Sequence, residues 1–115
     1  MRKIDKKIEN QLRNCLTDVC ERALKEITGF MWLTHKVNYA NFPQSLQIIC
    51  VFDTSDNLQA YRGSEQSKSL ESLIHTELMN TDIKVKNITK HVSFDTEQWC
   101  EAQHGGNWAN RLTKQ

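Results

Sequence analysis

Hydrophobic residues recur every three or four positions through the N-terminal part of the chain. This spacing predicts an α-helix over residues 3–28, with one apolar face and one charged face. Gly29 follows as a C-terminal cap, because glycine adopts a positive φ without steric cost. A helix this long needs a partner surface for its apolar stripe, which comprises Ile4, Ile8, Leu12, Leu16, Val19, Ala23 and Ile27, widened by Cys15, Cys20 and Leu24.

The next segment changes to the period of two that is typical of strands. In Phe30–Tyr39 one predicted face carries Met31, Leu33, His35, Val37 and Tyr39, and the other runs from Phe30 and Trp32 to polar residues. Leu46–Phe52 is apolar on both faces apart from Gln47, which indicates a central strand buried on both sides. The connecting loop is short and contains Pro43, so the two strands are predicted to pair antiparallel.

The C-terminal half predicts two more helices and one more strand. We expect a helical turn at Asn57–Tyr61, a helix at Ser67–Met79 capped by Ser67 or Ser69, and a strand within Ile83–Phe94, best at Ile88–Phe94. A short strand at Ile83–Val85 is a further candidate. The last helix spans Asp95–Gly106, opened by a capping box from Asp95 to Gln98, and one more turn is expected around Trp108 and Leu112. The order α-β-β-α-β-α predicts a single α+β domain over residues 1–115, with helices packed on a three-stranded mixed sheet.

Composition narrows the class of protein. With 115 residues, 38% of them hydrophobic, 25% charged and a net charge of +1, the chain predicts a globular domain without an overall basic field. No apolar run is long enough for a membrane span, and the basic start lacks the apolar stretch of a secretory signal. The cysteines form no CxxC pair and fall mostly in apolar patterns, which favours buried thiols in the cytoplasm: Cys15, Cys20, Cys50 and Cys100.

The tripeptide Phe-Asp-Thr ends two predicted strands, at Asp53 and at Asp95. If these strands are parallel, both carboxylates lie at the same sheet edge, where they could hold Mg²⁺ for phosphoryl transfer. The triplet Asp82-Ile83-Lys84 resembles one found in metal-dependent nucleases, and Glu26 is a further acid. An aspartate after a strand is more often a helix cap or turn residue, and this is the preferred interpretation.

Cys100 and His104 lie one helical turn apart, and His91 is a third candidate for a zinc site or a Cys/His dyad. The preferred interpretation is a buried cysteine and a helix-terminal histidine, with His35 at the edge of the core. We therefore predict no metal and no cofactor.

Two surfaces are candidates for partners. The basic residues Arg2, Lys3, Lys6, Lys7 and Arg13 could contact nucleic acid, although interleaved Asp5 and Glu9 favour a solvated helix face. Phe30, Trp32 and Trp108 are candidate interface residues. Trp108 follows Gly105-Gly106, which is interpreted as a helix stop that returns the tryptophan to the core.

Three segments resemble a group of small bacterial proteins labelled "Fis family transcriptional regulator". They are KIDKKIENQLRNCLTDVCERAL, GFMWLTHKVNYANFPQSLQIICVFDT and HVSFDTEQWCEAQHGGNWANRL, and they cover most of the chain. HGGNW and the NFPxSL loop are the most specific parts. The Fis regulator itself is all-helical and uses a C-terminal helix-turn-helix, whereas this chain predicts strands. The resemblance implies a regulator and assigns no residue a role.

Taken together, the sequence predicts a small cytoplasmic binding or regulatory protein without enzymatic activity. The alternatives are a nucleic-acid-associated regulator that uses the basic helix, and a metal-dependent phosphoryl-transfer enzyme or nuclease. A protein partner or a homodimer is expected, and no membrane.

Overall fold

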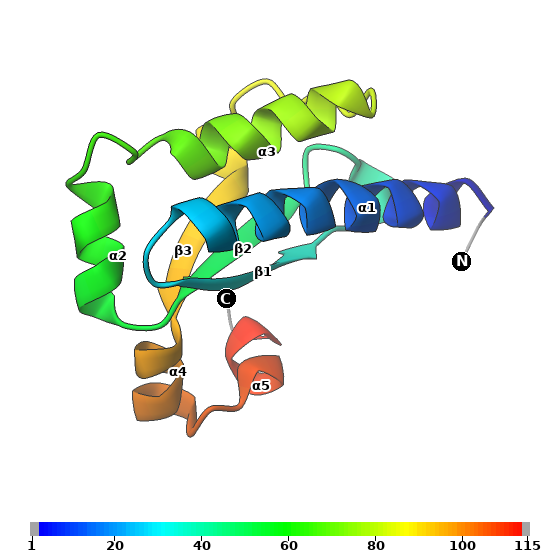
Figure 1. The fold of residues 1–115 in the computed structure, drawn as a ribbon. Helices are drawn as coiled ribbons and strands as arrows, with labels where there is room; N and C mark the ends of the chain where they lie inside the picture. The colour runs from blue at the N-terminus through cyan, green and yellow to red at the C-terminus, as the bar shows by residue number, and fades with distance from the viewer. Residues whose placement is uncertain (1–2, 114–115) are drawn as a thin grey trace.

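The computed structural model describes residues 3–113, apart from the side chain of Ile4, and confirms the α+β fold with a three-stranded mixed sheet. The element order follows the predicted α-β-β-α-β-α, with two further helices (Figure 1). The elements are α1 (Lys3–Glu26), β1 (Phe30–Lys36), the 3₁₀ helix η1 (Tyr39–Asn41), β2 (Gln47–Phe52), α2 (Ser55–Arg62), α3 (Ser69–Asn80), the 3₁₀ helix η2 (Ile88–His91), β3 (Val92–Thr96), α4 (Glu97–His104) and α5 (Trp108–Thr113).

The sheet has the order β1-β2-β3. β1 pairs antiparallel with β2, as predicted from the short loop, and β2 pairs parallel with β3. β2 is the central strand, and Ile48 to Phe52 are all buried. In Figure 1, α1 and α3 lie side by side over one face of the sheet, while α4 and α5 continue from the end of β3.

The main core lies between the α1–α3 layer and the sheet. Ile48, Cys50 and Phe52 of β2 point into it. The helices contribute side chains that are almost entirely removed from water: Leu12, Leu16 and Val19 from α1, and Leu70, Ile74 and Leu78 from α3. Each fully buried leucine or isoleucine contributes about 1.5–3 kcal/mol, so this layer is the main source of stability.

A β-bulge at Met31 changes the predicted faces of β1. Phe30 pairs with Phe52 and Trp32 pairs with Val51, so Met31 is an extra residue. Phe30 therefore joins the core side and is 4% exposed, whereas Met31 turns outward and is 46% exposed. The strict alternation predicted for this strand is wrong at these two positions, because alternation assumes uninterrupted pairing.

The third strand is displaced relative to its prediction. Ile88–His91 is a 3₁₀ helix, and β3 extends to Thr96. The last predicted helix accordingly begins at Glu97, with Thr96 rather than Asp95 as its N-cap. Ile83 and Val85 are buried without forming a strand.

Two more helical predictions need correction, and one is confirmed. The single turn expected at Asn57–Tyr61 is the full helix α2, whereas the turn predicted around Trp108 and Leu112 is present as the helix α5. α3 begins after Lys68, which provides no side-chain cap, so neither Ser67 nor Ser69 has the predicted capping role.

Within residues 3–113, no helix has the length and apolarity that crossing a membrane requires.

Candidate functional site

The two Phe-Asp-Thr segments form two similar strand-to-helix junctions at the carboxyl edge of the sheet. Each aspartate accepts a hydrogen bond from the next threonine N–H, at 2.6 Å for Asp53 and 2.8 Å for Asp95. Each threonine is the N-cap of the following helix: Thr54 caps α2 and Thr96 caps α4. The repeated tripeptide thus repeats a local turn, with threonine in the capping role expected for aspartate.

The two carboxylates also have different further partners. Asp53 receives the side-chain amide of Asn57 at 2.9 Å. Asp95 accepts two hydrogen bonds from Arg111, at 2.6 Å from Nε and 2.8 Å from Nη2. The side chains of Asp95 and Arg111 are 5% and 11% exposed, so this is a buried, bidentate ion pair.

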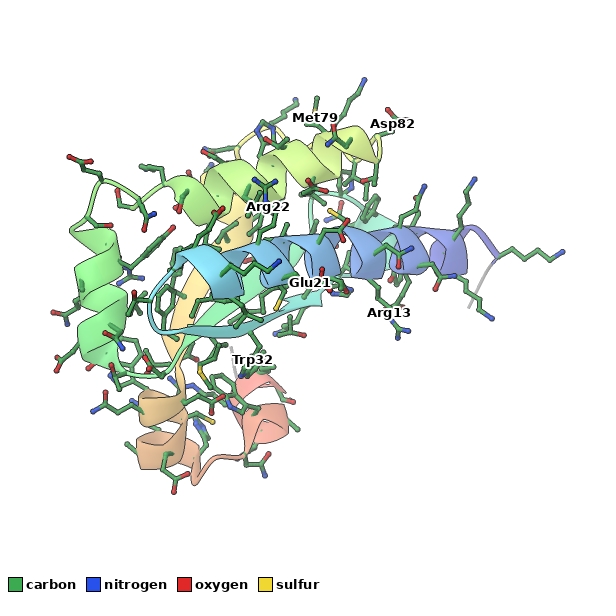
Figure 2. All side chains as sticks on the ribbon, viewed as in Figure 1. Arg13, Glu21, Arg22, Trp32, Met79 and Asp82 are labelled. Atoms are coloured by element: carbon green, nitrogen blue, oxygen red, sulfur yellow. The ribbon has the colours of Figure 1, made fainter. Side chains whose placement is uncertain are left out.

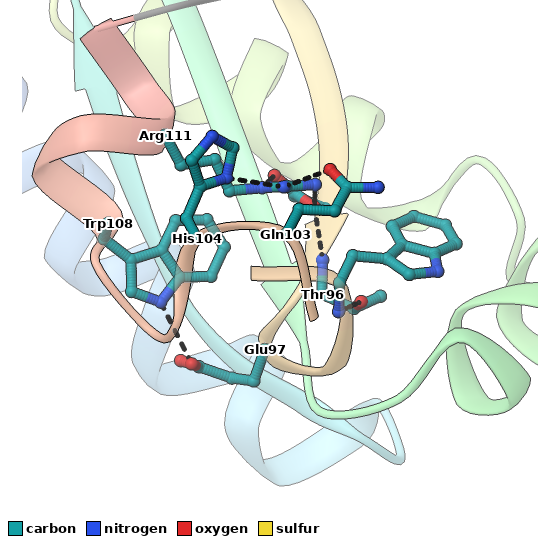
Figure 3. A network of polar contacts seen from close by, with 8 residues as sticks. Thr96, Glu97, Gln103, His104, Trp108 and Arg111 are labelled. Carbon is teal, nitrogen blue, oxygen red and sulfur yellow. Dashed lines mark hydrogen bonds and ion pairs between the residues drawn. The ribbon is translucent and has the colours of Figure 1, made fainter. Parts of the chain in front are cut away.

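The ion pair belongs to a polar network that fixes α4 and α5 to the second face of the sheet (Figure 3). Glu97 accepts hydrogen bonds from the indole N–H of Trp32 at 2.6 Å and of Trp108 at 3.0 Å. The two indole rings pack edge to face with centroids 4.8 Å apart. Arg111 also donates to Gln103 and to Nδ1 of His104. The hydrogen bond to Asp95 and the negative charge of its carboxylate raise the pKa of Arg111.

This network accounts for most of the candidate interface residues. Trp32 and Trp108 contact each other within the chain, and Phe30 lies in the core. Gly105 ends α4 with a φ of 59°, in the left-handed conformation expected of a helix stop. Trp108 then returns to the sheet, as the preferred interpretation of the Gly-Gly segment predicts.

Of the residues considered for zinc and nuclease chemistry, Cys100 and His104 lie one turn apart in α4, and His91, Asp82 and Lys84 lie elsewhere. Cys100 is buried in α4, and burial raises the pKa of its thiol. His91 precedes β3, at the strand end opposite to α4, where its Nδ1 donates to the Leu46 carbonyl at 2.7 Å. Asp82 and Lys84 are exposed in the loop between α3 and η2. Among the described residues, no group of three His, Cys, Asp or Glu side chains could hold a metal ion.

The basic residues of α1 form one continuous strip. Lys3, Lys6, Lys7 and Arg13 are all exposed, and at 3.6 residues per turn they span an arc of about 120°. The interleaved acids lie outside this arc: Asp5 is only 8% exposed, and the side chain of Glu9 is 24% exposed. Arg2 lies outside the described residues.

A groove of about 340 Å³ separates α1 from the outer side of β1. β1 is an edge strand, and no strand among residues 3–113 pairs with its outer side. The groove is lined by α1 residues Arg13, Leu16, Thr17, Cys20 and Glu21 and by β1 residues Leu33, Thr34 and His35.

The two elements that line this groove also carry two large exposed apolar side chains. Leu24, one turn beyond Cys20 on α1, is 53% exposed, and Met31 of the bulge is 46% exposed. We call the groove residues together with Leu24 and Met31 the edge surface. In the sequence, Leu24 appeared to widen the buried stripe of the helix, and only the packing shows that it faces outward.

The edge surface also contains perturbed titratable groups. Burial lowers the pKa of His35, an effect that Glu9, 3.7 Å from its Nε2, partly opposes. Burial raises the pKa of Cys20, while a hydrogen bond from the Leu33 backbone lowers it. The sulfur of Cys20, a weak acceptor, thus accepts a hydrogen bond from a backbone N–H of the edge strand.

No protein-family model, curated protein or solved structure matches this chain in the three comparisons made.

Proposed function

We propose that the chain is a non-enzymatic protein-interaction module that binds its partner through the edge surface. The observation that carries this proposal is that α1 and β1 together present a strand edge without a described strand partner, a groove and two exposed apolar side chains. Unpaired strand edges are templates for pairing with another chain, and proteins usually cover or charge them. The centre of β1 lacks such charges. It carries Leu33 and Thr34, and the neighbouring His35 is charged only when protonated.

The side chains that could take part in catalysis each have a structural role instead, which supports a binding function. Asp53 and Asp95 brace helix junctions, Arg111 neutralises Asp95, and Glu97 holds the two indoles. The free thiols of Cys15, Cys50 and Cys100 are buried, which agrees with the reducing cytoplasm that we propose as the location.

Site-specific photocrosslinking in cells tests this function. A photoreactive residue at Thr17, in the groove, is expected to give one discrete covalent adduct, whereas the same residue at Thr76, exposed on α3, gives none. The captured chain is identified by mass spectrometry and titrated against the purified protein. Binding that persists in a Leu24→Glu/Met31→Glu variant, or no adduct at Thr17, would overturn the proposal.

The basic strip of α1 favours a second function, contact with nucleic acid in a regulator such as the resemblance implies. The supporting observation is that Asp5 is buried and Glu9 pairs with Arg13, so the lysines keep their charge exposed along the strip. Phosphate contacts of this kind weaken steeply with salt.

Titration of duplex DNA at increasing salt tests this second function. We expect binding that falls as salt rises and is lost in a Lys3→Glu/Lys6→Glu/Lys7→Glu variant, while Lys25→Glu at the other end of α1 retains it. Binding that is absent or independent of salt excludes this function.

A further inference from the structure

We infer that the partner at the edge surface is a second copy of this chain, joined across the outer edges of the two β1 strands. This inference rests on the proposed function, since it names the partner of the same surface. In this dimer the two β1 strands pair antiparallel about a two-fold axis, and the two α1 helices lie side by side on the same face of a six-stranded sheet.

Charge on α1 selects this arrangement. Arg13 and Glu21 line the groove and lie equally far on either side of Thr17, four residues in each direction. When two α1 helices pair antiparallel about Thr17, each Arg13 meets Glu21 of the other copy. A parallel pair in register would instead bring like charges together, which is unfavourable.

Arg13 is available for this exchange. Its only ion pair within the described residues is with Glu9 at 3.8 Å, and 70% of its side chain is exposed. Such a long, exposed contact within one helix contributes little to stability. Figure 2 shows Arg13 and Glu21 on the ribbon of α1, with Arg22 on the side toward α3.

The strand edge and the apolar side chains fit the same axis. Thr34 lies at the centre of the β1 residues in the groove, so a two-fold axis there pairs Leu33 with His35 of the second copy. In this pairing the Leu33 N–H exchanges the sulfur of Cys20, a weak acceptor, for the second strand. In each copy, Leu24 and Met31 follow Glu21 and precede the groove residues of β1 in the sequence. The two-fold axis brings them toward the Arg13 end of the groove in the second copy. The exposed apolar area is thereby removed from water, the main driving force of association.

The test is the solution mass of charge variants, measured by light scattering during size-exclusion chromatography. The wild-type chain is expected to run as two chains of 13.4 kDa each. Arg13→Glu alone gives acids at both positions and Glu21→Arg alone gives bases at both, so each variant is expected to be monomeric. Mixed in equal amounts, they should form a heterodimer, since every contact is then between opposite charges.

Arg22→Glu is the matched control, because it makes the same charge change on the α3 side of α1 and should leave the dimer intact. Circular dichroism checks that each variant is folded. A wild-type chain with the mass of one chain at every loading concentration, single variants that stay dimeric, or a mixture that stays monomeric would each overturn the dimer.

The outcome at Thr17 separates this inference from the proposed function. If the wild-type chain is monomeric while the photoreactive residue at Thr17 captures a different protein, the dimer is wrong and the interaction module stands. If the chain is monomeric and Thr17 captures nothing, both fail.

Discussion

At the scale of single residues, the ion pair of Asp95 and Arg111 decides whether the second face of the sheet stays covered. Asp95 is buried at the end of β3, and Arg111 reaches it from α5, the last helix described. A carboxylate removed from water without a partner is strongly unfavourable, so Asp95 requires the guanidinium. Arg111 could not be singled out from the sequence, because its partner lies 16 residues away and only packing joins the two side chains.

Replacing Arg111 by methionine is expected to lower the free energy of unfolding by about 3 kcal/mol, because it removes the guanidinium that pairs with the buried charge of Asp95. Urea denaturation measures the loss, and Arg22→Met on an exposed face of α1 should change stability by less than about 0.5 kcal/mol. The double variant Asp95→Asn/Arg111→Met should be more stable than Arg111→Met. If it is less stable, the pair does not act as a charge pair.

The cysteines provide a second prediction at this scale. Burial raises the pKa of Cys15 to about 11 and that of Cys50 to about 12. The thiolate is the reactive form, so neither thiol should be alkylated in the native protein at neutral pH. Cys20, half-buried at the edge surface, should react before them. Mass spectrometry after timed alkylation measures the order, and earlier labelling of Cys50 would contradict it.

At the scale of elements, the turn between α1 and β1 depends on one glycine. Gly29 has a φ of 86°, and its carbonyl accepts the N–H of Asp53, which ties the start of β1 to the end of β2. An added Cβ would lie 2.6 Å from Cβ of Asn57 and displace the side chain that supports Asp53. Both the backbone conformation and the space require glycine here.

Gly29→Ala is therefore expected to destabilise the protein by about 2–3 kcal/mol, measured by urea denaturation. Gly63→Ala is the matched control at the end of α2. Its φ is −89°, and the added carbon would lie 3.5 Å from the nearest atom, the carbonyl oxygen of Gln59. This variant should be neutral or more stable by about 0.5 kcal/mol. Equal losses in the two variants would show that the left-handed turn is not the cause.

The elements that the sequence predicted well are those whose signal is local. The stripe of α1 and the continuous apolar run of β2 follow directly from residue spacing. The bulge at Met31 could not be predicted in this way, because it depends on which residue of β2 lies opposite. The 3₁₀ helix at Ile88–His91 imitates a strand, since its residues alternate between apolar and polar types.

The candidate site was predictable in part for the same reason. The sequence placed Arg13 on an exposed helix face and His35 near the core edge, but the groove exists only because two elements meet. The sequence predicts Trp32 and Trp108 as candidate interface residues. In the folded chain the two indole rings pack against each other.

At the scale of the whole molecule, the helices cover both faces of the sheet but leave its β1 edge open. α1 and α3 cover one face of the sheet, and α5 is fixed to the other through the indoles of Trp32 and Trp108. The β3 side is bordered by α2, whose Arg62 lies over the ring of Phe94 at 5.2 Å. The β1 side has the groove instead, so association at this edge would complete the structure without rearranging either layer.

This arrangement leads to a prediction about stability. If two copies associate through the edge surface, binding stabilises the folded state by mass action, by about 2.7 kcal/mol when the protein concentration is 100 times the dissociation constant. The melting temperature of the wild-type chain should therefore rise with protein concentration. Arg13→Glu should melt at one temperature throughout, because it cannot form the symmetric pair, and Arg22→Glu should follow the wild type. Scanning calorimetry over a wide range of concentrations measures all three. A wild-type melting temperature that does not change with concentration would show that the chain does not dimerise through the edge surface. The partner at the groove would then be a different protein.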